Sequence, residues 1–146
     1  MQPMDNPQAF AAAWAAAWNR KDVEAVLAHF DEQVQFSSPK AEVIVGTPVL
    51  HGKAALRAYW QQAVARIGTI HFQIERVLCD RDARTMLIVY HGQLDNRRVL
   101  AGELLSLSIE GLIVRGDALY GASLTYRGGT EHTGPGGDQK RLLQPR

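Results

Sequence analysis

Glu103 is the lone acidic residue in the largely apolar run Val99–Ile109. Because side chains alternate along a strand, it shares a side with Ala101 and Leu105. An isolated buried charge is very costly, so this carboxyl group must be protonated or paired. If it is protonated, it can donate a hydrogen bond to a carbonyl or enolate oxygen, or act as a general acid or base. The structural alternative is an ion pair with Arg76, provided that Arg76 points inward from the neighbouring strand.

The other reactive side chains offer little chemistry. Cys79 is the one cysteine, which excludes a disulfide framework or a thiolate zinc site within the chain. We interpret it as a structural thiol rather than a nucleophile. No pair of histidine and acidic residues has the spacing of metal ligands. We therefore expect no metal and no cofactor.

Length and charge restrict the classes of partner. The chain has 146 residues, the size of one domain, with 16 Lys plus Arg against 15 Asp plus Glu. A balanced charge provides no field that would hold a polyanion, so nucleic acid is not an expected partner. No apolar stretch approaches the roughly 18 residues of a membrane span, and the first residues lack a basic region followed by an apolar run. We expect no membrane association and a cytoplasmic location.

The first half of the chain predicts three helices. Phe10, Trp14 and Trp18 recur every four positions, which predicts an amphipathic helix over 7–19. Asp22 caps a second, shorter helix, and a third runs from Gly52 to about residue 66. A first strand ends at 37–39. Because the segment 40–50 is β-branched and contains glycine and proline, we interpret it as a flap or irregular strand rather than a helix.

The second half predicts a sheet. Four strand-like runs follow Gly68, separated by turns at 80–82, 95–96 and 110–111. Short turns between successive strands imply an antiparallel meander, so the fold class is α+β. From residue 127 the chain is rich in glycine and polar residues. We predict one domain over 1–126 and a flexible tail over 127–146.

The order of these elements resembles the nuclear transport factor 2-like superfamily, and most closely its SnoaL-like and ketosteroid isomerase-like branch. Three short motifs carry the resemblance: Leu27–Phe30 in the helix hairpin, His51–Leu56 at the start of the third helix, and Ile109–Ile113 in the final hairpin. The resemblance implies a cone-shaped fold in which three N-terminal helices pack on a curved antiparallel sheet and enclose a pocket. It also implies a homodimer formed through the outer face of the sheet.

The resemblance implies a catalytic role for one residue, and it shows that other catalytic positions of the family hold different residue types here. Glu103 matches the protonated aspartic acid that holds the oxyanion in ketosteroid isomerases. Ser38 occupies the place of their catalytic base, and Trp14 the place of their oxyanion-binding tyrosine. Ala118 matches the water-activating aspartate of the related limonene epoxide hydrolases, and the adjacent Asp117 points the other way. Steroid isomerisation and epoxide hydrolysis by those mechanisms are therefore not expected.

We predict a pocket for a small apolar molecule, with aromatic walls and a few polar groups. In the family register Met86, Ile88 and Tyr90 face this pocket, and His91 faces the outer side of the sheet. The predicted lining is Trp14, Trp18, Phe36, Ser38, Tyr59, Trp60, Phe72, Arg76, Met86, Ile88, Tyr90 and Tyr120, with Glu103 as the catalytic candidate. Two functions remain open. The protein is either a cofactor-free isomerase, cyclase or hydrolase type of enzyme, or a non-catalytic ligand carrier or dimerisation module.

Overall fold

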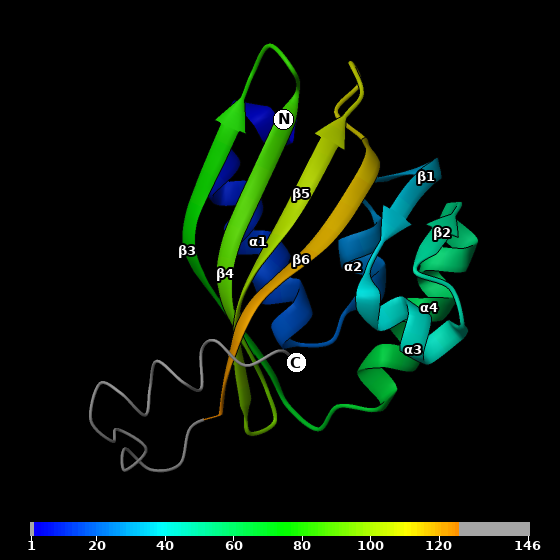
Figure 1. The fold of residues 1–146 in the computed structure, drawn as a ribbon. Coiled ribbons are helices and arrows are strands. Elements are labelled where there is room, and N and C mark those ends of the chain that lie inside the picture. Colours follow the sequence, from blue (N-terminus) through cyan, green and yellow to red (C-terminus); the bar gives the residue numbers. More distant parts are fainter. Residues whose placement is uncertain (1, 126–146) are drawn as a thin grey trace.

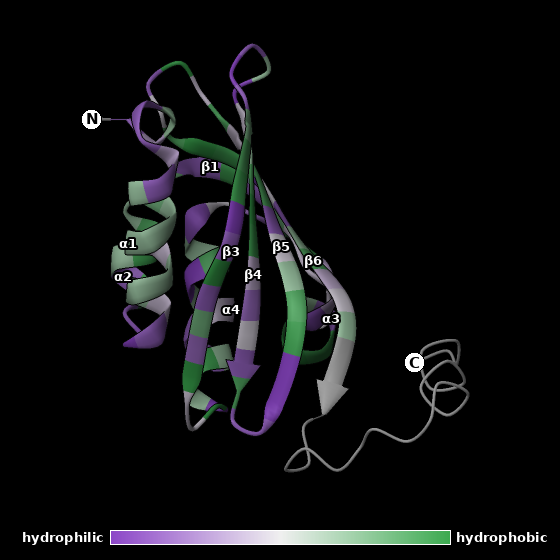
Figure 2. Cartoon of the chain, turned by 90° about the vertical axis from the view of Figure 1, so that its left-hand side faces the viewer, coloured by the Kyte–Doolittle hydropathy of each residue, from purple (hydrophilic) through white to green (hydrophobic). Residues whose placement is uncertain are grey.

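A computed structural model describes residues 2–125 of the chain, and the predicted tail lies outside this range. After a short 3-10 turn at Pro3–Asp5, four helices form: α1 (Pro7–Asn19), α2 (Val23–Leu27), α3 (Pro39–Val45) and α4 (Lys53–Ala65). The strands are β1 (Phe30–Ser37), β2 (Val49–His51), β3 (Ile70–Asp80), β4 (Thr85–Leu94), β5 (Arg97–Leu107) and β6 (Ile113–Thr125). The helices lie against one face of a curved sheet (Figures 1 and 2). The fold class predicted from the sequence is thus confirmed.

The sheet has six strands in the order β2-β1-β6-β5-β4-β3. β3 to β6 form the predicted meander, in which each strand runs antiparallel to the next along the chain. β1 pairs in parallel with β6, and the short β2 extends the sheet beyond β1. The long strands of the sheet are curved (Figures 1 and 2).

The aromatic stripe predicted on α1 is buried. The Asn6 side chain accepts a hydrogen bond from the backbone N–H of Ala9, which caps the helix start. Phe10, Trp14 and Trp18 are all buried against the sheet. α1 therefore closes the inner face of β3 along most of its length. Within residues 2–125, no helix is both long enough and apolar enough to cross a bilayer.

The prediction of a flap over 40–50 is wrong, because the first half of this segment is the helix α3. The Ser38 hydroxyl caps it by accepting a hydrogen bond from the Lys40 backbone N–H, and Pro39 occupies its first position. Gly46, at a φ of 87°, ends the helix in the left-handed conformation. The β-branched residues of the last turn have low helix propensity, but both ends of the helix carry strong signals.

A bulge in β3 explains why the predicted position of Arg76 is wrong. Ile74 pairs with Tyr90 and Arg76 with Val89, so Glu75 is an extra residue in the ladder. The insertion reverses the alternation, and Val77 takes the inward position that Arg76 would have held. Arg76 is exposed and forms no ion pair with Glu103. The structural alternative for Glu103 therefore fails.

Candidate functional site

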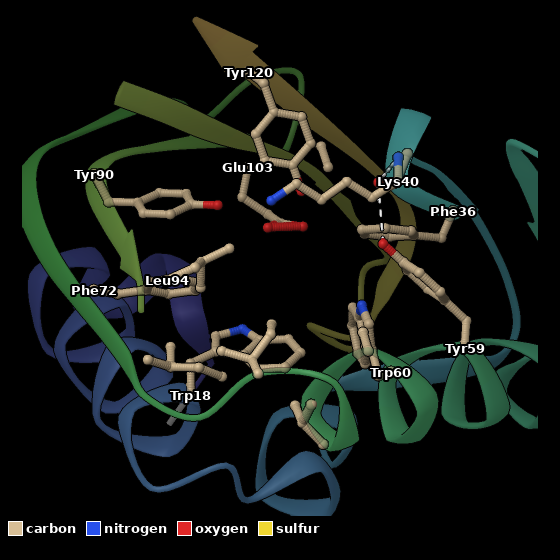
Figure 3. Close-up of a pocket in the computed structure, with 16 residues that line it drawn as sticks. Trp18, Phe36, Lys40, Tyr59, Trp60, Phe72, Tyr90, Leu94, Glu103 and Tyr120 are labelled. Carbon is tan, nitrogen blue, oxygen red and sulfur yellow. Dashed lines mark hydrogen bonds between the residues drawn. The ribbon is translucent and has the colours of Figure 1, made fainter. Parts of the chain in front are cut away.

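A hollow lies between the inner face of the sheet, α1 and α4 (Figure 3). Lys40, Leu94 and Tyr120 line the end where it adjoins a second hollow, and we call this end the mouth. The volume open to the centres of water-sized molecules within the first hollow is about 80 Å³. The side chains around it are Trp18, Phe36, Ser38, Lys40, Tyr59, Trp60, Ala63, Val64, Ile67, Ile70, Phe72, Tyr90, Leu94, Glu103, Ala118 and Tyr120. Most are apolar, as a site for a small organic molecule requires.

Glu103 provides the carboxyl group of this hollow. It lies on β5, opposite Ile88 of β4 and Ala118 of β6, and its side chain points into the cavity (Figure 3). The residue is only 6% exposed, and no side chain among residues 2–125 hydrogen bonds to its carboxyl group. Burial, together with a smaller effect from the nearby charge of Asp117, raises the pKa of Glu103 to about 8. The group is therefore mostly a neutral acid at pH 7.

Aromatic rings hold the walls of the hollow in place. The rings of Trp18 and Trp60 meet edge to face with centroids 5.0 Å apart, and Phe36 packs against Trp60 at 5.3 Å. On the opposite side the rings of Phe72 and Tyr90 lie 4.6 Å apart. Such contacts fix ring orientations through their electrostatic preference for edge and offset geometries. The cavity is therefore bounded by side chains that support one another.

Two further polar groups belong to the interior. Trp18 Nε1 is fully buried and has no hydrogen-bond partner among the described residues, and Figure 3 shows it directed into the hollow. An unsatisfied buried donor costs free energy, so it is a position where a ligand oxygen would be favourable. The Ser38 hydroxyl, by contrast, is engaged by Tyr59 Oη at 3.2 Å and by the backbone of Lys40. Burial raises the pKa of Tyr59, so its phenol stays neutral.

Lys40 at the mouth was not predicted as a site residue. Its amine lies 4.5 Å from the centroid of the Tyr120 ring, a cation–π contact. Partial burial lowers the pKa of Lys40, and the positive charge of Arg97 lowers it as well. The Ser38-Pro39 pair is a sequence signal for a helix start. It would have placed Lys40 in the first turn of a helix rather than in a flap.

The structure brings most predicted lining residues together, although ligand binding by them stays a prediction. Those around the hollow are Trp18, Phe36, Ser38, Tyr59, Trp60, Phe72, Tyr90, Glu103 and Tyr120. Trp14, Arg76, Met86 and Ile88 are not among them. The other lining residues that were missed include Ala63, Val64 and Ile67, which continue the buried stripe of Tyr59 and Trp60 along and beyond α4.

Three predicted lining residues, Trp14, Met86 and Ile88, are buried but do not line the hollow, and their positions in the fold explain why. The Trp14 ring lies behind the wall, 5.0 Å from the Tyr90 ring and 5.5 Å from the Phe72 ring. Met86 and Ile88 face inward as predicted and are fully buried. They lie farther from the mouth along β4 than Tyr90 does, where the core is filled by side chains. Their assignment to the lining is therefore corrected to the core.

The positions that carry a base in related enzymes hold none here. Ser38 serves as a helix cap, and Ala118 presents a methyl group to the hollow. Asp117 points away from the hollow, where it accepts a hydrogen bond from the Ser37 hydroxyl at 2.5 Å and one from Arg115 at 3.3 Å. Over the range 2–125, no group of three or more His, Cys, Asp or Glu residues could hold a metal ion.

The architecture defines an α+β protein in which helices cover a curved sheet, and comparison with known proteins identifies the family. The family described as SnoaL-like domain matches residues 11–140, so the chain belongs to the SnoaL-like family. A crystal structure of a SnoaL-like protein from Burkholderia thailandensis is 31% identical, with a TM-score of 0.69, and the match covers 79% of this chain and 94% of that one. No curated protein matches the chain.

Two more distant structures share the fold. SalBIII, an epoxide hydrolase/cyclase-like enzyme with a role in pyran ring formation in salinomycin, is 20% identical with a TM-score of 0.67, covering 86% of this chain and all (100%) of its own. TerC, co-crystallised with polyporic acid, is 11% identical with a TM-score of 0.65, covering 80% and 92% of the two chains. At these identities the likeness concerns the fold alone.

Proposed function

We propose that the protein binds a small, largely apolar molecule in the hollow, and that Glu103 acts on an oxygen of that molecule as a hydrogen-bond donor and acid–base group. The observation that carries the proposal is a buried carboxyl group, open to an aromatic cavity, with no partner among residues 2–125. A carboxyl group in this setting is neutral at neutral pH. It therefore has a proton to donate.

The electrostatics favour an uncharged ligand oxygen at the inner end. With a pKa of about 8, Glu103 is protonated over ionised by about ten to one at pH 7. Trp18 also lines the hollow, and its buried Nε1 is a second donor that lacks a partner among the described residues. Two donors and apolar walls fit a carbonyl or enol oxygen better than a cation or a metal-bound group.

One carboxyl group suffices for a proton shift without a cofactor. Glu103 would give its proton to a carbonyl oxygen as the bond to an adjacent carbon hydrogen weakens. The resulting carboxylate would then accept that carbon's proton, which leaves an enol and restores the acid. In a ligand with a carbon–carbon double bond conjugated to the enol, Glu103 delivers its proton to the far carbon while its carboxylate takes the enol O–H proton, which isomerises the ligand. In a ligand with a second carbonyl group, the enol carbon attacks that carbonyl carbon and its π bond breaks. Glu103 then protonates the new alkoxide and takes the enol O–H proton, which closes a ring and restores the acid. SalBIII is described as cyclase-like, which is consistent with ring formation on this fold.

A non-catalytic carrier is the second candidate, and the site residues give it specific support. Ser38 and Ala118 occupy the two places that hold a base in related enzymes, so no second acid–base group faces Glu103 from those positions. In a carrier, Glu103 and Trp18 would hold a ligand oxygen without proton transfer. The two candidates share one binding site and differ only in chemistry.

Binding is tested with two probes that differ by one oxygen, 2-naphthol and naphthalene, followed by the fluorescence of Trp18 and Trp60. We expect wild type to bind 2-naphthol about tenfold more tightly, the value of one good buried hydrogen bond. Glu103→Met should abolish this preference because it removes the donor and keeps the bulk. Glu110→Gln, in an exposed turn, is the control. Equal binding of both probes by wild type contradicts the proposal.

Proton transfer is tested with 2-tetralone, an apolar bicyclic ketone, in heavy water. Nuclear magnetic resonance would follow the exchange of the hydrogens next to the carbonyl for deuterium. The enzyme proposal expects exchange above the buffer rate that is lost in Glu103→Gln, which keeps the shape but not the acid. If the ketone binds but the exchange of its hydrogens is not accelerated, the result supports the non-catalytic carrier over the enzyme.

We also propose a homodimer formed through the outer face of the sheet. Leu78 and Leu119 are 51% and 48% exposed, which is high for large apolar side chains on strands. Leu87 and Leu119 flank Gly102 and so form a continuous apolar surface across three strands. Covering this surface with a second copy would remove it from water.

A further inference from the structure

A second hollow adjoins the mouth of the first. Its lining consists of Lys40, Leu94, Arg97, Val99, Tyr120 and Gly121, and the volume open to the centres of water-sized molecules within it is about 120 Å³. Lys40, Leu94 and Tyr120 line both hollows, so the two spaces are adjacent and meet at these side chains. A ligand that fills the inner hollow would therefore reach the second one at its outer end.

The charged side chains of this outer hollow are both cations. Neither Lys40 nor Arg97 forms an ion pair with any residue between 2 and 125. The two positive charges repel each other, and the charge of Arg97 accordingly lowers the pKa of the Lys40 amine. Two cations held near one another in a concave surface create a positive potential that an anion would relieve.

The acidic residues around the mouth do not supply that anion. Glu103 is neutral at pH 7 and lies deeper in the hollow. The Asp95 carboxylate accepts hydrogen bonds from the backbone N–H groups of Gly68 and Thr69. Asp117 is directed to the other face of the sheet. None of the acidic groups that the structure describes thus neutralises the positive charge at the mouth, which is available to an anionic ligand.

The local fold holds Lys40 in this position. Ser38 caps α3 and accepts a hydrogen bond from the Lys40 backbone, which places the side chain in the first turn of the helix. The amine then extends over the Tyr120 ring toward the cavity rather than into solvent (Figure 3). Holding a lysine half-buried costs solvation of the ammonium group, a cost that an anionic ligand would offset.

From these contacts we infer that Lys40 and Arg97 form an anion subsite at the mouth, and that the ligand is an amphipathic organic acid. Its apolar body fills the aromatic hollow, its neutral oxygen meets Glu103, and its carboxylate lies between the two cations. This inference rests on the proposed function for the inner end of the ligand. The inference adds that the outer end of the ligand carries an anionic group, a carboxylate.

The test compares 2-naphthol with 6-hydroxy-2-naphthoate, which adds a carboxylate at the opposite end of the same rings. At pH 7 and low salt, wild type should bind the naphthoate about tenfold more tightly, and added salt should reduce this preference. Lys40→Gln and Arg97→Gln should each lower the preference, and the double variant should abolish it. Arg98→Gln, the adjacent arginine that lines neither hollow, should leave it unchanged.

The outcomes separate this inference from the function on which it rests. The anion subsite is overturned if the naphthoate binds no better than the naphthol, if neither probe binds, or if the preference survives in the double variant. If the naphthol binds and depends on Glu103 but the carboxylate adds nothing, the proposed function stands alone. A carboxylate preference that depends on Lys40 and Arg97 but not on Glu103 supports the subsite and contradicts the role of Glu103.

Discussion

Glu103 and Ala118 are directly paired across β5 and β6, and both side chains line the hollow. Because the side chain of Ala118 is only a methyl group, the space beside the carboxyl group stays open. The depth of the cavity next to Glu103 thus depends on one small residue on the neighbouring strand.

Enlarging Ala118 should therefore close the site. Ala118→Leu adds three carbon atoms beside Glu103, so we expect binding of 2-naphthol to weaken by about tenfold or more. Because the added atoms enter a cavity rather than the packed core, the midpoint of thermal unfolding should change by only a few degrees. Fluorescence titration and thermal unfolding measure the two effects. Ala83→Leu in the exposed β3–β4 turn is the control, and undiminished binding by Ala118→Leu would place the ligand elsewhere.

The raised pKa of Glu103 predicts a specific pH dependence of stability. In the unfolded chain the group ionises near its ordinary value of 4.5, whereas in the folded chain its pKa is about 8. Between these values the folded state binds the extra proton, so the free energy of unfolding falls as pH rises, by up to about 1.4 kcal/mol per pH unit. Below and above this window the contribution is flat.

Glu103→Gln should remove that slope. The stability of the variant relative to wild type should increase from about pH 4.5 to about pH 8, as measured by urea unfolding at a series of pH values. Glu110→Gln, which changes an exposed acid, should show no such trend. A stability difference that is independent of pH would mean that Glu103 ionises normally in the folded protein.

The wall of the hollow at Phe36 depends on a glycine. Phe36 is paired with Gly116 across β1 and β6, and a Cβ atom at Gly116 would lie 2.7 Å from the Phe36 ring. Gly116→Ala should therefore displace the ring and cost about 1–3 kcal/mol of stability. In a double-mutant cycle with Phe36→Leu, the two costs should be clearly less than additive, because the smaller side chain relieves the contact. Additive costs would mean that the ring does not oppose the new methyl group.

The proposed dimer predicts a sensitive position on the outer face. Leu119→Lys introduces a charge into the exposed apolar surface, and we expect it to convert a dimer into a monomer in analytical ultracentrifugation. Val43→Lys, at an 81% exposed position on α3, should leave the oligomeric state unchanged. A monomeric wild type, or a Leu119→Lys variant that stays dimeric, contradicts an interface at this surface.

The course of the chain could be predicted largely from local signals. The period-four aromatics of α1, the glycine before α4 and the turns between the meander strands each act within a few residues. α3 escaped prediction because β-branched Val43 and Ile44 favour a strand, whereas the helix is specified at its ends by Ser38 and Gly46. Capping outweighed propensity in this short segment.

On the strands, the face to which a side chain points was predictable only where strict alternation holds. Glu103 and Tyr90 follow from period two, and both face the hollow. Arg76 fails because a single inserted residue in β3 reverses the alternation, and nothing local in the sequence marks that bulge. Trp14 and Trp18 share one helix face, but Trp18 lines the hollow whereas the Trp14 ring packs behind Tyr90 and Phe72, a difference that helix periodicity does not predict.

The central claim is that the Glu103 carboxyl group is a neutral acid facing a cavity. An isotope-edited NMR titration of glutamate side-chain carboxyl carbons, with the signal assigned by its loss in Glu103→Gln, measures this directly. The account predicts a midpoint of about 8, which shifts when 2-naphthol is added to saturation. A midpoint near the ordinary value of 4.5 that does not respond to the probe would contradict it.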